Sequence, residues 1–168
     1  MEPAKQALVD INWALAAASP DATKYIPDQV ASVQGKLTDL DASYDKQDYA
    51  AVLAGAPAVL TEAKGLAAAA AAKRDEVMKA LAAQWTELSP SVPQLVTSVK
   101  TRVDALSKTR RVPKGVDLAA AKSGLGDATA LWDKAQAAFQ SNHVADAVTA
   151  AKDAKAKAEA AAAALKIN

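Results

Sequence analysis

Five aromatic side chains are the groups in this sequence best suited to binding an apolar ligand. Most of them fall on apolar stripes of expected helices, so packing in the core is one explanation of their spacing. The helices around them are faced largely with alanine, and such small residues either let helices pack closely or leave space between them. A few large rings bordering an alanine-lined gap could therefore hold an apolar molecule. The candidate ligand-binding residues are Tyr44, Tyr49, Trp85, Trp132 and Phe139.

A local excess of positive charge surrounds the expected loop 107–115. It could contact anionic lipid headgroups or an acidic surface of a partner protein. An ordinary loop flanked by helix-end cations, which favour the helix dipole, is the alternative. No aromatic side chain interleaves with these cations, so we expect no nucleic-acid binding. The candidate contact residues are Lys108, Arg110, Arg111 and Lys114, and Lys100 and Arg102 precede them.

Groups for catalysis or metal binding are sparse. His143 is the sole histidine and there is no cysteine, so no thiol nucleophile and no second imidazole is available. We expect His143 to be a solvent-facing turn residue and the protein to be no enzyme, because phosphate-binding loops and nucleophile elbows are also absent. Four aspartates spread around an expected helix without an intervening glycine, so we expect a solvated face and no metal or cofactor. They are Asp39, Asp41, Asp45 and Asp48.

The composition indicates an all-α protein. Hydrophobic residues make up 51% of the 168 residues, but much of this share is alanine, the best helix former, and aromatic residues make up only 4%. The β-branched and aromatic residues that strands prefer are correspondingly sparse. The formal net charge is +1, so the chain as a whole has no strong preference for polyanions. Its length allows one domain or two tightly joined halves.

Apolar periodicity predicts a single helical domain over 1–168, a bundle of about six antiparallel helices. Hairpin A covers about 27–72, a linking pair of helices about 73–106, and hairpin B about 113–167. The segment 89–93, SPSVP, is expected to end one helix and open the next, because proline lacks the N–H that an interior turn needs. Asp48 and Asp117 are the expected N-caps of the helices that follow them.

The stretch 44–52, YDKQDYAAV, has a counterpart 95 positions later in 139–147, FQSNHVADA. Each stretch ends one apolar-periodic segment, passes through a polar turn and begins another, as a helical hairpin does. We interpret the two hairpins as duplicates. The alternative is that any two alanine-rich amphipathic hairpins align this well. The matched positions are Tyr44 with Phe139, Tyr49 with Val144, Leu37 with Trp132, and Val30 with Leu125.

Three short motifs carry a resemblance to a known group of proteins: Trp132-Asp133-Lys134-Ala135, Asp48-Tyr49-Ala50-Ala51 and Val112-Pro113-Lys114-Gly115. The chain resembles the tetratricopeptide-like, alanine-rich hairpin proteins of the bacterial cell envelope. The helical component of the bacterial sterol transporters is one candidate relative. Such proteins are often exported or lipid-anchored. The resemblance implies a periplasmic location, with an outer-membrane anchor on a full-length precursor as one form, while a cytoplasmic location stays open.

We therefore expect a non-catalytic binding protein of the periplasm or envelope, holding a lipid-like ligand between hairpins as part of a transport system. A sterol is one candidate ligand. Its burial would contribute roughly 25 cal/mol per Å², and the hydroxyl of Tyr44 or Tyr49 or the indole N–H of Trp132 could orient it. The alternative is a tetratricopeptide-like protein–protein interaction scaffold with no ligand cavity. Expected partners are a hydrophobic small molecule or lipid and envelope proteins, and no transmembrane segment is expected because no stretch of about 18 strongly apolar residues occurs.

Overall fold

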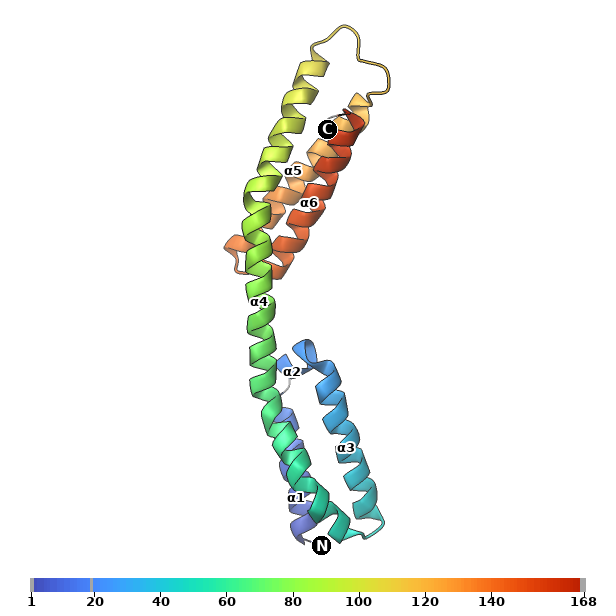
Figure 1. Cartoon of the computed structure of the whole chain (residues 1–168), viewed down its shortest axis with the longest axis vertical. Helices are drawn as coiled ribbons and strands as arrows, with labels where there is room; N and C mark the ends of the chain where they lie inside the picture. Colours follow the sequence, from blue (N-terminus) through green and yellow to red (C-terminus); the bar gives the residue numbers. More distant parts are fainter. Residues whose placement is uncertain (1, 19, 167–168) are drawn as a thin grey trace. The chain divides into compact units, whose positions relative to one another are not determined.

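The fold consists of α-helices joined by short turns and one longer loop (Figure 1). The computed structural model describes residues 2–18 and 20–166, and no strand occurs within these ranges. This confirms the predicted all-α fold. One short helix between residues 21 and 25 was not expected from the sequence. The helices are α1 (Glu2–Ala18), α2 (Asp21–Tyr25), α3 (Pro27–Asp45), α4 (Tyr49–Ser107), α5 (Leu118–Gln140) and α6 (Val144–Ala164).

The contacts between residues divide the chain into two compact units, Met1–Val77 and Met78–Asn168. The first unit contains α1, α2, α3 and the first part of α4. The second contains the rest of α4 with α5 and α6. The segment 73–106 was expected to link the two hairpins, but most of it forms the first helix of the second unit. In the first unit, α1 is added to hairpin A. The expectation of a single domain over 1–168 stays a prediction.

Helix α4 is continuous for 59 residues, so the predicted break at 89–93 is wrong. Pro90 cannot donate a hydrogen bond to the carbonyl of Thr86, which normally interrupts a helix. Pro90 is exposed, however, so water can reach the backbone there, and Leu88 and Val92 on either side of it are buried. Packing of these two residues keeps the helix intact where local preference opposes it.

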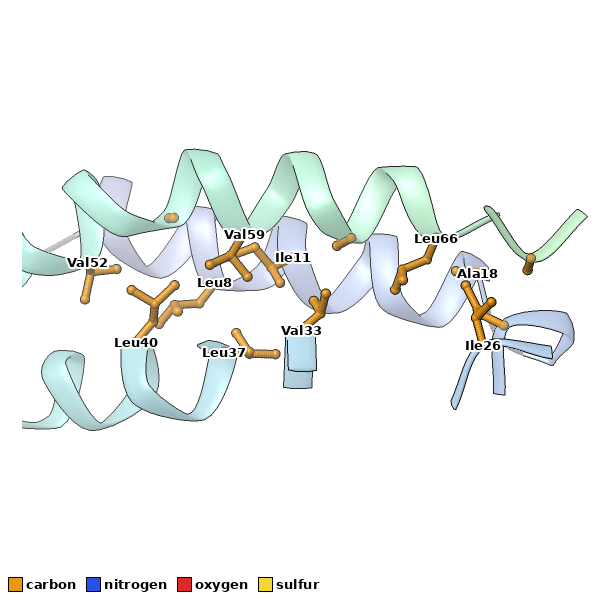
Figure 2. Packing of buried hydrophobic residues seen from close by; sticks show 14 of the residues in the cluster. Leu8, Ile11, Ala18, Ile26, Val33, Leu37, Leu40, Val52, Val59 and Leu66 are labelled. Atoms are coloured by element: carbon orange, nitrogen blue, oxygen red, sulfur yellow. The ribbon is translucent and has the colours of Figure 1, made fainter. Parts of the chain in front are cut away.

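The core of the first unit is a seam between α1, α3 and α4 (Figure 2). Its apolar residues recur three or four positions apart, which places them on one face of each helix. Each fully buried aliphatic side chain contributes roughly 1.5–3 kcal/mol to stability. Among the described residues no polar or charged side chain is buried. Members from the three long helices include Leu8, Ile11, Val33, Leu37, Leu40, Val52, Val59 and Leu66.

In the second unit α5 and α6 meet through small residues. A Cβ atom at Gly124 would lie 3.1 Å from the Cβ of Ala161 and 3.4 Å from the carbonyl oxygen of Lys157, so the two helices approach closely at this glycine. Larger side chains of α4, including Val92 and Val99, complete the core against them. The second core is therefore closely packed at the seam of its hairpin.

The buried positions of the second hairpin repeat those of the first at the 95-residue shift. On α3 and α5, Val33, Leu37 and Leu40 are buried and so are Ala128, Trp132 and Ala135. On α4 and α6 the agreement continues over about five helical turns. This extends the predicted correspondence to the inward faces of both helices of each hairpin. The pairs formed by α4 with α6 and with the C-cap residue of α6, Leu165, are Val52 with Ala147, Ala56 with Ala151, Val59 with Ala154, Ala63 with Ala158, Leu66 with Ala161, and Ala70 with Leu165.

Candidate binding surfaces

Two of the five candidate aromatic residues lie together at the turn of the first unit. The ring centroids of Tyr44 and Tyr49 are 5.3 Å apart in an edge-to-face arrangement, a favourable geometry for aromatic pairs. Both side chains are half-buried and pack against the first core. The pair joins the end of α3 to the start of α4 across the turn.

The other three aromatic residues form a stack in the second unit. Trp85 of α4 stacks on Phe139 with centroids 4.3 Å apart and on Trp132 with centroids 5.6 Å apart. Trp132 is buried, whereas Phe139 keeps 41% of its surface exposed. The structure thus brings together Trp85, Trp132 and Phe139, and separately Tyr44 and Tyr49. A ligand-binding role for either group stays a prediction.

One hollow on the surface of the second unit has a volume of about 450 Å³. None of the five aromatic residues lines it. Arg102 of α4 and Lys166, which follows α6, bring two positive charges to it. Neither cation forms an ion pair in the part of the chain that the structure describes. Its lining residues are Ser98, Thr101, Arg102, Ala105 and Lys166.

The four cations predicted to contact an anionic surface lie in the loop between α4 and α5. Lys108, Arg110, Arg111 and Lys114 are all exposed, and within the described ranges none of them forms an ion pair. The end of this loop is tied to α6, because the backbone N–H of residue 117 donates to the carbonyl oxygen of residue 164 at 2.9 Å.

Lys166 belongs to the same end of the second unit as this loop. Its ammonium nitrogen lies 2.5 Å from the position a Cβ would take at Gly115, whose φ is +80°. Any residue with a Cβ at position 115 would therefore displace the Lys166 side chain, whereas glycine leaves it in place. The sequence pattern did not indicate Lys166, because it lies beyond the last apolar-periodic helix and far along the chain from the other cations.

The predicted N-caps are confirmed. Asp48 accepts a hydrogen bond from the backbone N–H of Ala51 at 3.1 Å, and Asp117 accepts one from Ala120 at 2.9 Å. His143 is exposed and stands at the N-cap of α6 without a side-chain hydrogen bond to that helix. The four aspartates that were predicted to form a solvated face are all exposed. Partial burial of the Asp41 carboxyl, and secondly the charge of Asp45, raise the pKa of Asp41.

No group of three or more histidine, aspartate or glutamate side chains is placed to hold a metal ion in residues 2–18 and 20–166. Within the same ranges α4 is the one helix long and apolar enough to cross a membrane by length and composition alone. Core helices of soluble proteins meet the same criteria. The expectation that the chain has no transmembrane segment stays a prediction.

Three exposed apolar side chains were not indicated by the sequence. Trp13 is 74% exposed, Leu53 is 47% exposed and Val9 is 39% exposed. Val9 and Trp13 stand four residues apart on α1, off the stripe of buried residues on that helix. The sole available signal was that these large apolar residues fall outside the buried periodicity.

Comparison with known proteins adds no relationship. The sequence matches no protein-family model, no curated protein and no solved structure.

Proposed function

We propose that this protein is a non-catalytic helical module that holds a partner protein on its surface. The observation that carries the proposal is the 74% exposure of Trp13. Tryptophan is the residue type most enriched among those that dominate binding energy at protein interfaces. Val9, one turn before it, extends the same apolar ridge. Exposed apolar residues that adjoin one another offer a surface that a partner protein can cover.

Site-specific photo-crosslinking tests the proposal. A benzophenone amino acid at position 13 is expected to give a discrete crosslinked product in the source cells. The same probe at Ala31, an exposed position of α3, is the matched control and should give none. Excess wild-type protein should suppress the product, whereas excess Trp13→Ala protein should not. Equal crosslinking from both positions would contradict a specific partner surface.

The alternative that the protein holds a lipid-like ligand between hairpins rests on the resemblance to envelope transport proteins. In its favour, Phe139 offers an exposed ring beside Trp85. Against it, the α5–α6 seam is filled by alanine and by Gly124, so a sterol-sized molecule would have to part the helices. Extraction of the purified protein with organic solvent, followed by mass spectrometry, decides this. A stoichiometric lipid would favour the ligand-holding function over the scaffold.

A second candidate function is contact with an anionic surface. The observation that favours it is that the loop cations and the two cations of the 450 Å³ hollow lack ion-pair partners among the described residues. Replacing Arg110 and Arg111 with serine should weaken sedimentation with phosphatidylglycerol vesicles, most clearly at low salt, because screening removes such attraction. A matched double variant, Lys64→Gln with Lys79→Gln, should bind as the wild type does. Unchanged binding of the arginine variant would contradict this function.

The periplasmic location is proposed on the resemblance alone. Fractionation of source cells with a specific antibody tests it, and recovery of the protein with cytoplasmic markers would contradict it.

A further inference from the structure

The 450 Å³ hollow of the second unit is lined along one side by a single face of α4. Its α4 residues stand at positions 98, 101, 102 and 105, the spacing that places side chains on one helical face. Among the described residues no carboxylate lines the hollow. The hydroxyls of Ser98 and Thr101 already donate to carbonyl oxygens one turn earlier. The guanidinium of Arg102 is therefore the main hydrogen-bond donor that α4 brings to the hollow.

Lys166 lines the same hollow from a left-handed backbone position. Its φ is 53°, and its N–H donates to the carbonyl oxygen of Ala163 at 3.0 Å, so it follows the last turn of α6. Glycine is the favoured residue at such a position, because a left-handed backbone is strained for a residue with a Cβ. A lysine that is kept there despite the strain points to a role for its side chain.

The loop between α4 and α5 leaves room for the Lys166 ammonium. The ammonium nitrogen lies 2.5 Å from the place that a Cβ of Gly115 would occupy, so the lysine side chain rests against this glycine. The end of the loop is itself attached to α6 by the hydrogen bond between the backbones of residues 117 and 164. The loop and α6 thus hold the ammonium at the hollow that Arg102 lines.

The charge around the hollow is positive. Between residues 98 and 117 the chain carries six cations and two acids, Asp104 and Asp117. The C-terminal ends of α4 and α6 each add about half a negative charge, which the full charges of Arg102 and Lys166 outweigh. A guanidinium forms paired hydrogen bonds with phosphate oxygens, and an ammonium adds a point charge. A phosphate monoester carries about two negative charges near neutral pH and so matches the two cations, whereas a carboxylate carries one.

We propose that this hollow binds the phosphate group of a phosphate monoester, held by Arg102 and Lys166. The proposal goes beyond contact with an anionic surface, because the hollow recognises one chemical group and not negative charge in general. Such a group occurs both on small soluble molecules and in the headgroup of phosphatidic acid. The terminal phosphate is the same in both sources, and the experiment separates them.

Titration of glycerol phosphate into the isotope-labelled, full-length protein, followed by amide chemical shifts, tests the site. We expect saturable binding with the largest shifts at residues 98–105 and 164–166, and no saturation with acetate over the same concentration range. Arg102→Gln should weaken binding about fivefold, because it removes a charge-assisted pair of hydrogen bonds at an exposed site. Lys134→Gln, which neutralises an exposed cation of α5 that does not line the hollow, is the matched control and should bind as the wild type does.

Lys166→Gly separates binding from folding. The change removes the ammonium but gives the left-handed position the residue that it favours. The affinity for glycerol phosphate should fall about fivefold, while the midpoint of urea unfolding is kept or raised. Unchanged affinity in this variant or in Arg102→Gln would overturn the proposal. So would absence of saturable binding, or acetate binding as tight as that of glycerol phosphate.

Vesicles distinguish the two sources of the phosphate. With a lipid source, vesicles containing phosphatidic acid should sediment more protein than phosphatidylglycerol vesicles of matched surface charge, and Arg102→Gln should remove this excess. With a soluble source, both kinds of vesicle should sediment the protein equally although glycerol phosphate binds. If replacing Arg110 and Arg111 with serine abolished vesicle binding and glycerol phosphate did not bind, the proposed site would be rejected and the anionic-surface function would remain.

Discussion

Gln47 and Asn142 adopt the same left-handed backbone, with φ of 63° and 64°, at the same step of two turns 95 positions apart. The N–H of Gln47 donates to the carbonyl of Tyr44 at 2.9 Å, and the N–H of Asn142 donates to that of Phe139 at 3.0 Å. The following residue of each turn donates five positions back, at 2.9 Å in both cases. The first helix of each hairpin therefore ends in the same C-cap motif, which has a left-handed residue at a position that favours glycine or asparagine.

Gln47→Gly should stabilise the first unit. A left-handed φ costs a glutamine about 1 kcal/mol and costs glycine almost nothing. We expect the free energy of unfolding to rise by about 0.5–1 kcal/mol, measured by urea denaturation. Asn142→Gly should gain less, because asparagine tolerates this backbone. As a control, Gln34→Gly in the interior of α3 should lower stability by a similar amount. A loss of stability with Gln47→Gly would contradict the turn geometry.

His143→Ser should stabilise α6. In the first hairpin the matching residue, Asp48, caps α4 through the N–H of Ala51, whereas His143 makes no such bond. A serine at this position can accept from the N–H of Asp146, and N-caps contribute about 0.5–2 kcal/mol. The change should appear in tryptophan-monitored unfolding of the second unit. The reciprocal variant, Asp48→Ala, should destabilise the first unit by a similar amount. No gain from serine would indicate that the N-terminus of α6 is already satisfied by water.

Pro90→Ala should stabilise α4 without changing its course. Proline inside a helix destabilises the folded state by about 3 kcal/mol relative to alanine. Part of this cost is offset because proline also lowers the conformational entropy of the unfolded chain. We expect a gain of about 1–2 kcal/mol in the free energy of unfolding. Pro3→Ala is the matched control, because proline in the first turn of α1 breaks no hydrogen bond, and it should change stability by less than about 0.5 kcal/mol. A destabilised Pro90→Ala protein would favour the interrupted helix that the sequence predicted.

The sequence predicted the fold where buried residues follow a regular period. The pairing of Leu37 with Trp132 was visible because both lie on apolar stripes, and burial of both residues agrees with it. The continuity of α4 through Pro90 was not predictable, because it depends on tertiary packing of Leu88 and Val92. Local rules describe the cost of a proline but not the contacts that offset it.

The candidate surfaces were less predictable than the core. Tyr44 and Phe139 were identified as matching residues of two turns, and both do adjoin those turns. The exposure of Leu53 was not visible, because its pattern resembles that of the buried Val148. Whether such a residue is covered depends on a segment remote in sequence. Periodicity describes a face of a helix, and tertiary structure decides what lies against it.

The stability of the first unit should depend on the protonation of Asp41. Asp41 is exposed overall, but partial burial of its carboxyl, and secondly the charge of Asp45, raise the pKa of this group from its usual 3.8. The folded state therefore binds this proton more tightly than the unfolded chain does. The favourable contribution is complete below the unfolded pKa and is lost as pH rises through the raised folded pKa. Both carboxylates also lie near the C-terminal end of α3, where the helix dipole disfavours negative charge.

Asp41→Asn should accordingly increase the melting temperature relative to wild type at about pH 7 by more than it does at about pH 3. Asparagine removes the charge that folding disfavours at neutral pH, whereas wild-type Asp41 is already neutral in acid. Asp45→Asn provides the control, because it removes the smaller of the two causes. The carboxyl pKa of Asp41, followed by NMR titration, should fall in that variant and yet stay above 3.8, because burial persists. An Asp41→Asn effect independent of pH would show that the carboxyl is solvated as freely in the folded state as in the unfolded chain.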